Sequence, residues 1–352
     1  MKKSITILFV AVISLSATIA QKKIIYIPDI PGYVTLKCDF HIHTVFSDGQ
    51  VWPTYRIDEA WKDGLDVLAI SDHLEYQPHK EYIPVDHNAA FDIASKLAKE
   101  RNLLLIHATE ITRSMPPGHL NALFLDDAAE IFVDDPFETI EKAVQQGGFI
   151  QWNHPGWKAQ EPDGIPKLYD IHMKLLDNGY VHGIEFFNST EYYPNILEWC
   201  KEYDLAVISN SDEHEIIAES YGHITRPMTL VFARERSKES LKEAMFDART
   251  LAYFNNTLAG REDLLRQVFE ASISVGKPYY ENERFIWVEV TNSSDVPFHM
   301  INGKQGAASE FTIEANSITT LRIEKGSAEP LEWDIKNMLT GYDEYLHVEL
   351  EY

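Results

Sequence analysis

The sequence predicts an α/β fold, a barrel of alternating strands and helices, followed by a small antiparallel β-sandwich. From Val34 to about Asn255, short apolar runs alternate with longer amphipathic stretches. The presence of seven or eight such units favours a closed barrel over an open sheet. After Leu264 the pattern changes to strands in which apolar and polar residues alternate, which is typical of antiparallel sheets.

The barrel strands are expected at the continuous apolar runs, because strands covered by helices are buried on both faces. Pro53 and Pro136 each suit the first turn of a helix, and Ser237 followed by Ser240 predicts a further helix start. The expected strands are VTLKCDF, DVLAIS, LLLIHATEI, NALFL, GFIQW, GIEFF, AVISN and MTLVFA. The expected helices follow Pro53 and span residues 88–101, 136–146, 166–177 and 237–248.

The C-terminal part carries two isolated histidines, His299 and His347, and no cluster of metal-binding residue types. Its expected role is to dock against the barrel or to shape the cleft, and not to carry out chemistry. The strands expected here are FEASISV, RFIWVEVT, EFTIEA, ITTLRIE and LHVELE, with turn clusters between them. The predicted division is a signal peptide at 1–20, a barrel domain at 21–263 and a β-sandwich domain at 264–352.

The N-terminus has the features of a secretory signal peptide. Lys2 and Lys3 form a basic start, an apolar stretch covers residues 5–12, and small residues lead to Ala20 with Thr18 two positions before it. A membrane anchor is the alternative, but the apolar stretch is short for a helix that spans a bilayer. We therefore expect cleavage after Ala20, a periplasmic or secreted protein, and no stable insertion into a membrane.

The composition limits the partners. The chain has 352 residues and a formal net charge of −24, and such a surface repels polyanions, so nucleic acid is not an expected partner. A small anionic ester can still bind where metal ions reverse the local field. The two cysteines, Cys38 and Cys200, are expected to be buried thiols, and whether they pair stays open, as does the oligomeric state.

Histidines and carboxylates gather at the ends of the expected strands. His41 and His43 follow the first strand, and an H-x-H pair points both rings to one side of an extended chain, where they can share one metal ion. The C-terminal strand ends of a barrel meet at one mouth, where active sites form. The other residues placed in this way are Asp48, Asp72, His73, Glu110, His119, His154, Asp212 and His214.

Such a set of converging groups is costly to bury without cations. Two to three divalent transition-metal ions would remove that cost, and Glu110 could bridge two of them. A mixture of nitrogen and oxygen ligands suits Mn, Zn or Fe, and argues against Ca or Mg alone. The sequence therefore predicts a metal centre at the mouth of the barrel.

Four motifs in order carry a family resemblance: HIHTVFSDG, AISDH, Glu110 with GHLNALF, and NHP followed by SNSDEH. Over residues 34–260 the chain resembles the PHP (polymerase and histidinol phosphatase) metalloesterases. The resemblance implies a distorted seven-stranded barrel with a trinuclear metal site. It assigns His41, His43, Glu110 and Asp212 to one metal, Glu110, His119 and His154 to the second, and Asp48, His73 and His214 to the third. The layout of a signal peptide and an appended sandwich resembles the bacterial secreted Sb-PDE-type phosphodiesterases.

The resemblance and the metals together imply a phosphoesterase whose nucleophile is a metal-bridging hydroxide. Glu110 and Asp212 are the expected catalytic carboxylates, and Asp72 is expected to orient a ligand histidine. The expected substrate-binding residues are Arg226, Arg113 and Trp157. For either arginine, a surface salt bridge is an equally good interpretation.

The favoured function is hydrolysis of small organic phosphodiesters. A phosphomonoesterase of the same fold and a non-catalytic metal-binding module are the alternatives. An amidohydrolase-like activity is a third, because similar barrels host the hydrolysis of carbonyl compounds. The physiological substrate and the native metal cannot be named from the sequence.

Overall fold

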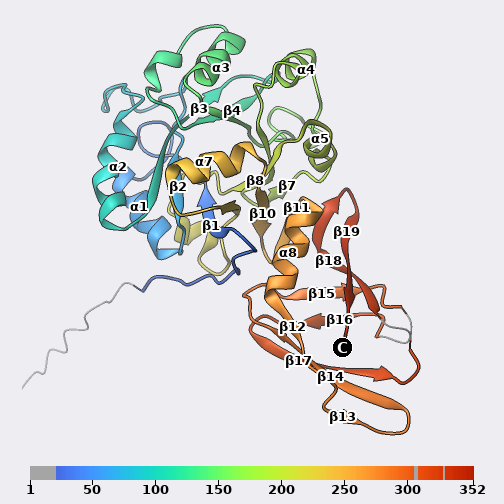
Figure 1. Cartoon of the computed structure of the whole chain (residues 1–352). Helices are drawn as coiled ribbons and strands as arrows, with labels where there is room; N and C mark the ends of the chain where they lie inside the picture. Colours follow the sequence, from blue (N-terminus) through green and yellow to red (C-terminus); the bar gives the residue numbers. More distant parts are fainter. Residues whose placement is uncertain (1–20, 305–307, 328–329) are drawn as a thin grey trace, which may run out of the picture.

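The computed structural model describes residues 21–304, 308–327 and 330–352, and shows an α/β barrel followed by a β-sandwich (Figure 1). The predicted fold class is confirmed. The predicted signal peptide lies outside the described residues. Within the described part of the chain, no helix has both the length and the apolar character that crossing a bilayer requires.

Seven strands line the barrel, and an eighth, β9, closes it. The pairs β1–β2, β2–β3, β5–β6 and β6–β8 are parallel, as predicted. Between β8 and β9 the side chain of Thr229 accepts from Ser209 N and donates to Ser209 O, both at 2.9 Å. The strands are β1 (Val34–Asp39), β2 (Val67–Ile70), β3 (Leu104–Thr112), β4 (His119–Leu123), β5 (Phe149–Trp152), β6 (Gly183–Asn188), β8 (Ala206–Asn210) and β9 (Met228–Ala233).

The barrel is not parallel throughout. Strand β4 runs antiparallel to both β3 and β5, and β9 runs antiparallel to β1. The connection from β3 to β4 covers only residues 113–118, which is too short for the crossover that a parallel pair needs. This reversal distorts the barrel and places His119 at the start of β4, beside the end of β3.

Helices surround the barrel (Figure 1). Asp135 and Ser237 cap two of them, because their side chains accept from Glu138 N and Ser240 N. Helix α4 begins a few residues later than predicted. The helices are α1 (Pro53–Lys62), α2 (Ala89–Glu100), α3 (Pro136–Gln145), α4 (Asp170–Asp177), α5 (Ile196–Tyr203), α6 (Ile217–Tyr221) and α7 (Lys238–Phe246), with a short 3-10 turn at Ala129–Ile131.

An apolar cluster joins the inner residues of the barrel strands to α7. Cys38, Phe149 and Ile208 belong to this cluster, together with Leu241 and Met245 of α7. The polar residues of the chain's motifs are therefore left at the opposite, C-terminal ends of the strands. Cys38 and Cys200 are both buried free thiols.

The C-terminal domain is a sandwich of two sheets, built from β19–β18–β15–β16 and from β14 with β12, β13 and β17. Its strands are β12 (Ile273–Val275), β13 (Tyr280–Glu281), β14 (Phe285–Asn292), β15 (Phe298–Ile301), β16 (Phe311–Ile313), β17 (Ser317–Glu324), β18 (Leu331–Gly341) and β19 (Glu344–Leu350). One expected strand, FEASISV, is wrong in its first half, because helix α8 (Glu262–Ser272) extends through it. Leu264, Leu265, Val268 and Phe269 of α8 are buried with helical spacing.

The two domains share a sheet. After β9 the barrel continues into the hairpin β10 (Thr250–Phe254) and β11 (Thr257–Gly260). Strand β18 then pairs in parallel with β11, with Leu258 opposite Met338 and Ala259 opposite Leu339. The sandwich is thus joined to the barrel by backbone pairing as well as by α8 (Figure 1).

Candidate metal centre

His41 lies just beyond the end of β1 and is fully buried. A hydrogen bond from its Nδ1 fixes the orientation of its ring. Its Nδ1 donates to Glu185 Oε1 at 2.9 Å. This bond turns Nε2 toward Asp212 Oδ1, at 3.1 Å, and Glu110 Oε1, at 3.4 Å. Glu185 comes from β6, so a carboxylate on a distant strand sets the orientation of the first ring of the H-x-H pair.

Glu110, on β3, is the hub of the site and is completely buried. Asn153 Nδ2 holds its Oε1 at 3.0 Å. Five histidine rings surround this single carboxylate, which is the arrangement expected of a group that bridges cations. The contacts are with His41 (3.4 Å), His43 (3.9 Å), His119 (3.1 Å), His154 (3.7 Å) and Nδ1 of His73.

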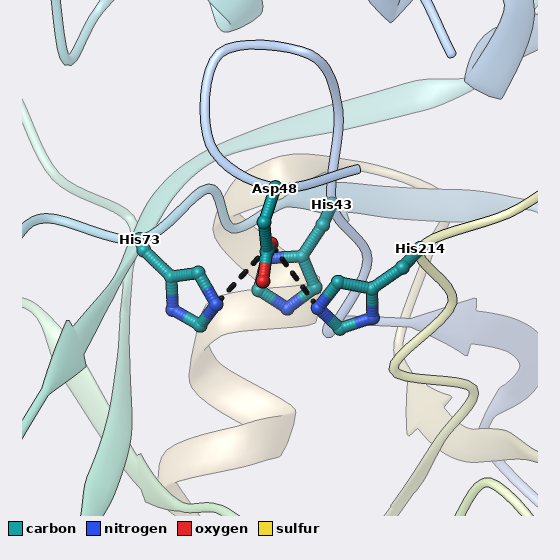
Figure 2. Close-up of side chains that lie close together, drawn as sticks. All are labelled: His43, Asp48, His73 and His214. Atoms are coloured by element: carbon teal, nitrogen blue, oxygen red, sulfur yellow. Dashed lines mark ion pairs between the residues drawn. The ribbon is translucent and has the colours of Figure 1, made fainter. Parts of the chain in front are cut away.

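A second cluster is built around Asp48, in the loop after β1. Figure 2 shows the rings of His43, His73 and His214 converging on its carboxylate. Asp48 Oδ1 lies 3.3 Å from His73 Nε2, 3.2 Å from His214 Nε2 and 3.9 Å from His43 Nδ1. The four residues come from three different strand ends, as the sequence predicts.

Asp212 connects the two clusters. Its Oδ1 lies 3.0 Å from His43 Nε2, and Asn188 Nδ2 donates to its Oδ2 at 3.3 Å. The backbone of Asp212 has a φ of 52°, a left-handed conformation that aspartate tolerates better than most residues. The turn directs Asp212 toward the cluster around Glu110, and it directs His214 toward the cluster around Asp48.

The electrostatic field of the site favours positive charge. Burial lowers the pKa of His73, but the charges of Glu110 and Asp48 outweigh burial and raise the pKa to about 10. Burial and the neighbouring His214 and His73 lower the pKa of His43 to about 3. The carboxylates thus favour positive charge at His73, while burial and the neighbouring imidazoles disfavour it at His43.

One buried atom tests the fit of a metal ion. Among the described residues, His41 Nε2 has no hydrogen-bond partner although it faces the carboxylates of Asp212 and Glu110. A cation held by these atoms would satisfy all three groups, and the nitrogen and oxygen donors suit divalent transition metals. Three groups have ligand atoms within 4.8 Å of one another: His43, Asp48, His73 and His214; His41, His43 and Asp212; and His41, Glu110 and His154.

These groups differ in detail from the ligand sets that the family resemblance implies. His41 joins Glu110 and His154 in place of His119, and His43 also approaches the Asp48 cluster. His119 instead touches Glu110 from the side, with its ring 4.9 Å from that of His154. The structure brings all nine expected ligands together, and which ligand serves which ion stays a prediction.

The site opens into a cavity of about 440 Å³. Trp157, expected to bind substrate, stands on its wall with its ring 5.3 Å from that of His154. Among the described residues that line the cavity there is no lysine and no arginine. The wall consists of Asp48, His73, Glu110, His119, His154, Trp157, Asn188, Ser189, Thr190, Glu191, Asp212 and His214.

The two arginines expected to bind substrate do not line this cavity. Arg226 is 1% exposed, and its guanidinium is bonded to Asp39 and to Ser211 Oγ. Arg113 lies 2.8 Å from Glu75 and donates to the backbone oxygens of Val133 and Asp134. Both guanidinium groups are held inside the protein, because polar groups from other segments pack against them.

Asp72 acts less directly than expected. It accepts from Thr44 N, Thr44 Oγ1 and Ser47 Oγ, each at 2.7 Å, and so shapes the loop after β1. It reaches His43 only through Ser47 Oγ, which lies 3.4 Å from His43 Nδ1. The carboxylate that directly orients a ligand histidine is Glu185, which the sequence analysis missed.

Glu185 had a signal in the sequence. It is a lone carboxylate in the apolar run GIEFF, and a buried charge in a strand needs partners. Those partners belong to a buried polar network behind the metal centre. Glu185 accepts from His41 Nδ1, His154 N, Gln151 Nε2, Asn188 Nδ2 and Asn210 Nδ2.

The chain matches two family models, a PHP domain over residues 39–260 and an Ig-like domain over residues 273–351. It is similar to a crystal structure from Bacteroides vulgatus, described as a two-domain protein containing a predicted PHP-like metal-dependent phosphoesterase. The two are 38% identical with a TM-score of 0.90, over 94% of this chain and 99% of that chain.

Part of the sequence is also similar to curated proteins. An uncharacterised protein of Methanocaldococcus jannaschii is 26% identical over 203 residues, 51% of this chain and 82% of that protein. A 5′-3′ exoribonuclease of Haemophilus influenzae is 28% identical over 145 residues, 41% of this chain and 47% of that protein. The PHP match covers most of the barrel, and the motifs that carry it form the metal centre described above. The chain belongs to the PHP family and has the architecture of a two-domain, PHP-like metal-dependent phosphoesterase.

Proposed function

We propose that this protein is a phosphodiesterase that acts on small organic phosphodiesters and uses two to three divalent transition-metal ions, Mn, Zn or Fe. One observation carries the proposal: nine candidate metal ligands lie together, and seven of them line a cavity of about 440 Å³ whose described wall has no lysine or arginine. The charge of a phosphate group in this cavity therefore has to be neutralised by metal ions. A phosphodiester, with a single negative charge, requires less neutralisation than a monoester.

Bound metal ions would supply an activated water molecule and Lewis-acid stabilisation of the phosphate oxygens. The chain supplies geometry. Glu110 and Asp212 would hold the ions, and Asn153 and Asn188 fix those carboxylates by hydrogen bonds of 3.0 and 3.3 Å. Glu185 keeps the Nε2 of His41 aimed at the same point, so the ligands need little rearrangement when the ester binds.

Substrate size follows from the cavity and the surface. A cavity of about 440 Å³ suits a small ester. The formal net charge of −24 repels a polyanion along its length, so nucleic acid is not the proposed substrate. The similarity to an exoribonuclease covers less than half of that protein and makes a nucleic acid the essential comparison in the test.

The test compares kcat/KM for bis-p-nitrophenyl phosphate, p-nitrophenyl phosphate and single-stranded DNA, after loading with Mn, Zn or Fe. The diester is expected to be the best substrate, and Glu110→Ala should abolish its hydrolysis. If DNA is preferred, the size and charge argument is wrong. A preference for the monoester would instead leave a phosphomonoesterase of the same metal centre.

We also propose that the enzyme works in the periplasm or outside the cell, where it would release phosphate from small esters. The support is the basic start, apolar stretch and small residues that end at Ala20. N-terminal sequencing of the protein recovered from the periplasm or medium should begin at Gln21. Recovery of the full-length chain from the cytosol would contradict this proposal.

A further inference from the structure

A two-residue turn, Ser189 and Thr190, lines the cavity at the metal centre. It joins β6 to the short strand β7 (Glu191–Tyr192), and Asn188 pairs with Glu191 across the hairpin. Residues directly opposite each other in an antiparallel pair point to the same face. Asn188 bonds Asp212 on that face, so Glu191 also points toward the centre, and it lines the cavity.

The carboxylate of Glu191 is held in place. Tyr193, on the same face of the chain and only 3% exposed, donates its hydroxyl to Glu191 Oε2 at 2.7 Å. The Tyr193 ring packs so closely on the turn after His154 that a Cβ at Gly156 would come within 2.9 Å of it. Tyr192, the next residue, is 58% exposed. Glu191 is therefore the charged residue of this hairpin on the cavity wall.

Glu191 has no lysine or arginine partner among the described residues, so its negative charge is not neutralised by the protein. It is also not one of the clustered candidate ligands. Trp157, next to Gly156, presents a 40% exposed indole on the wall of the same cavity. A carboxylate together with an indole face is a combination that binds organic ammonium groups.

We propose that Glu191, with Trp157, selects phosphodiesters whose second alcohol carries an ammonium group. This inference rests on the proposed phosphodiesterase function and names its substrate class. The phosphate would bind at the metal centre while the ammonium group binds at the Glu191 carboxylate and the Trp157 ring. The same carboxylate would repel the second negative charge of a monoester. Glu191 would therefore account for the preference for diesters.

The experiment uses a matched pair of substrates with the metal-loaded full chain. One is p-nitrophenyl phosphocholine, and the other is its isostere with an uncharged tail, in which a tert-butyl group replaces the trimethylammonium group. The wild type should favour the ester with the ammonium tail by about fivefold in kcat/KM, and the preference should shrink as salt is added. Glu191→Gln should bring the two substrates within about twofold, mainly by slowing the ester with the ammonium tail.

A matched control is Glu198→Gln, which removes one exposed carboxylate from helix α5, away from the cavity wall. It should keep the wild-type preference. Equal rates on the two esters in the wild type, or a preference that survives Glu191→Gln, would overturn the inference while the phosphodiesterase function stands. Loss of metal in Glu191→Gln would also overturn it, because Glu191 would then be a ligand. If the wild type hydrolyses no diester at all, bis-p-nitrophenyl phosphate included, both proposals fail.

Discussion

Histidine–aspartate contacts of nearly equal length occur in the barrel and in the sandwich. His43 Nε2 lies 3.0 Å from Asp212 Oδ1, and His347 Nδ1 lies 2.9 Å from Asp334 Oδ1. The barrel pair is more enclosed, with side chains 0% and 17% exposed, and it lies beside the buried carboxylates of Glu110 and Glu185 and several imidazoles. The sandwich pair is open to solvent, with side chains 42% and 29% exposed, and Asn302 also donates to Asp334.

The difference shows that contact distance does not mark a functional pair. Exposed charges are solvated by water, and their mutual contact contributes little. Buried carboxylates have no such solvent, and a cluster of them is stable only with cations. The demand for metal ions therefore comes from the number of carboxylates enclosed together, and the sandwich serves as an internal control for that statement.

The largest contrast is expected from removing one carboxylate in each region. Glu110→Ala should lower kcat/KM for a phosphodiester by at least about a hundredfold, because the hub of the metal centre is lost. Elemental analysis should show fewer bound ions. Asp334→Ala, its matched control, should retain metal and activity. Near-wild-type turnover in Glu110→Ala would remove the basis of the proposed function.

Removal of the metal ions with a chelator should lower the thermal stability through the barrel site and not through the sandwich. An ion present at about a hundred times its Kd stabilises the fold by about 2.7 kcal/mol, so stripping the metal should lower Tm by about 5 °C. Differential scanning calorimetry would measure the shift with and without chelator. Asp334→Ala should show the same shift and Glu110→Ala should show a smaller one. If the chelator leaves the Tm of the wild type unchanged, the carboxylate cluster is stable without cations.

Glu185→Gln should have a smaller effect than the loss of Glu110, because Glu185 orients His41 and is not expected to bind the metal. The amide keeps the volume but no longer accepts from His41 Nδ1 with a full charge. Metal affinity should fall by about tenfold to a hundredfold in competition with a coloured chelator. Unchanged affinity would show that the buried network behind the site serves the fold alone.

The smallest effect is expected in the sandwich. Burial tends to raise the pKa of Asp334, but hydrogen bonds from Asn302 and His347 lower it below its usual range. The stability that comes from a lowered carboxylate pKa is present above the unfolded pKa of about 3.9 and is lost as the pH falls through the folded value. His347→Gln should therefore cost about 0.5 kcal/mol or less in urea unfolding at neutral pH, and still less near pH 3. A cost above about 2 kcal/mol would show that this pair is as tightly coupled as those in the barrel.

The ligand residues could be predicted because they lie at or just beyond the ends of apolar strands, and the topology brings strand ends together. His41, Glu110 and Asp212 are examples. The partners of the residues that orient them could not be predicted, because those partners are far away in sequence. Glu185 is 144 positions from His41 in the sequence. Arg226 is 187 positions from Asp39, which accepts a hydrogen bond from its guanidinium group. A charged residue near a motif looks the same in sequence whether it faces substrate or another segment.

The fold shows the same division. Alternating apolar runs and amphipathic stretches predicted the barrel and the sandwich. The reversed direction of β4 depends on the short connection 113–118, and the extent of α8 depends on its packing between the domains. Apolar residues near Phe269 fit both a strand and a helix, and the burial of four of them on one helical face decides between the two.

The pairing of β18 with β11 has a consequence for how the chain can be divided. A cut after residue 263, at the predicted domain boundary, would remove β18 and leave the backbone of Leu258 and Ala259 without its partner. An unpaired apolar edge strand is a template for adding strands from other molecules. The isolated barrel should therefore self-associate in solution, because the sandwich would no longer cover the edge of its sheet at β11.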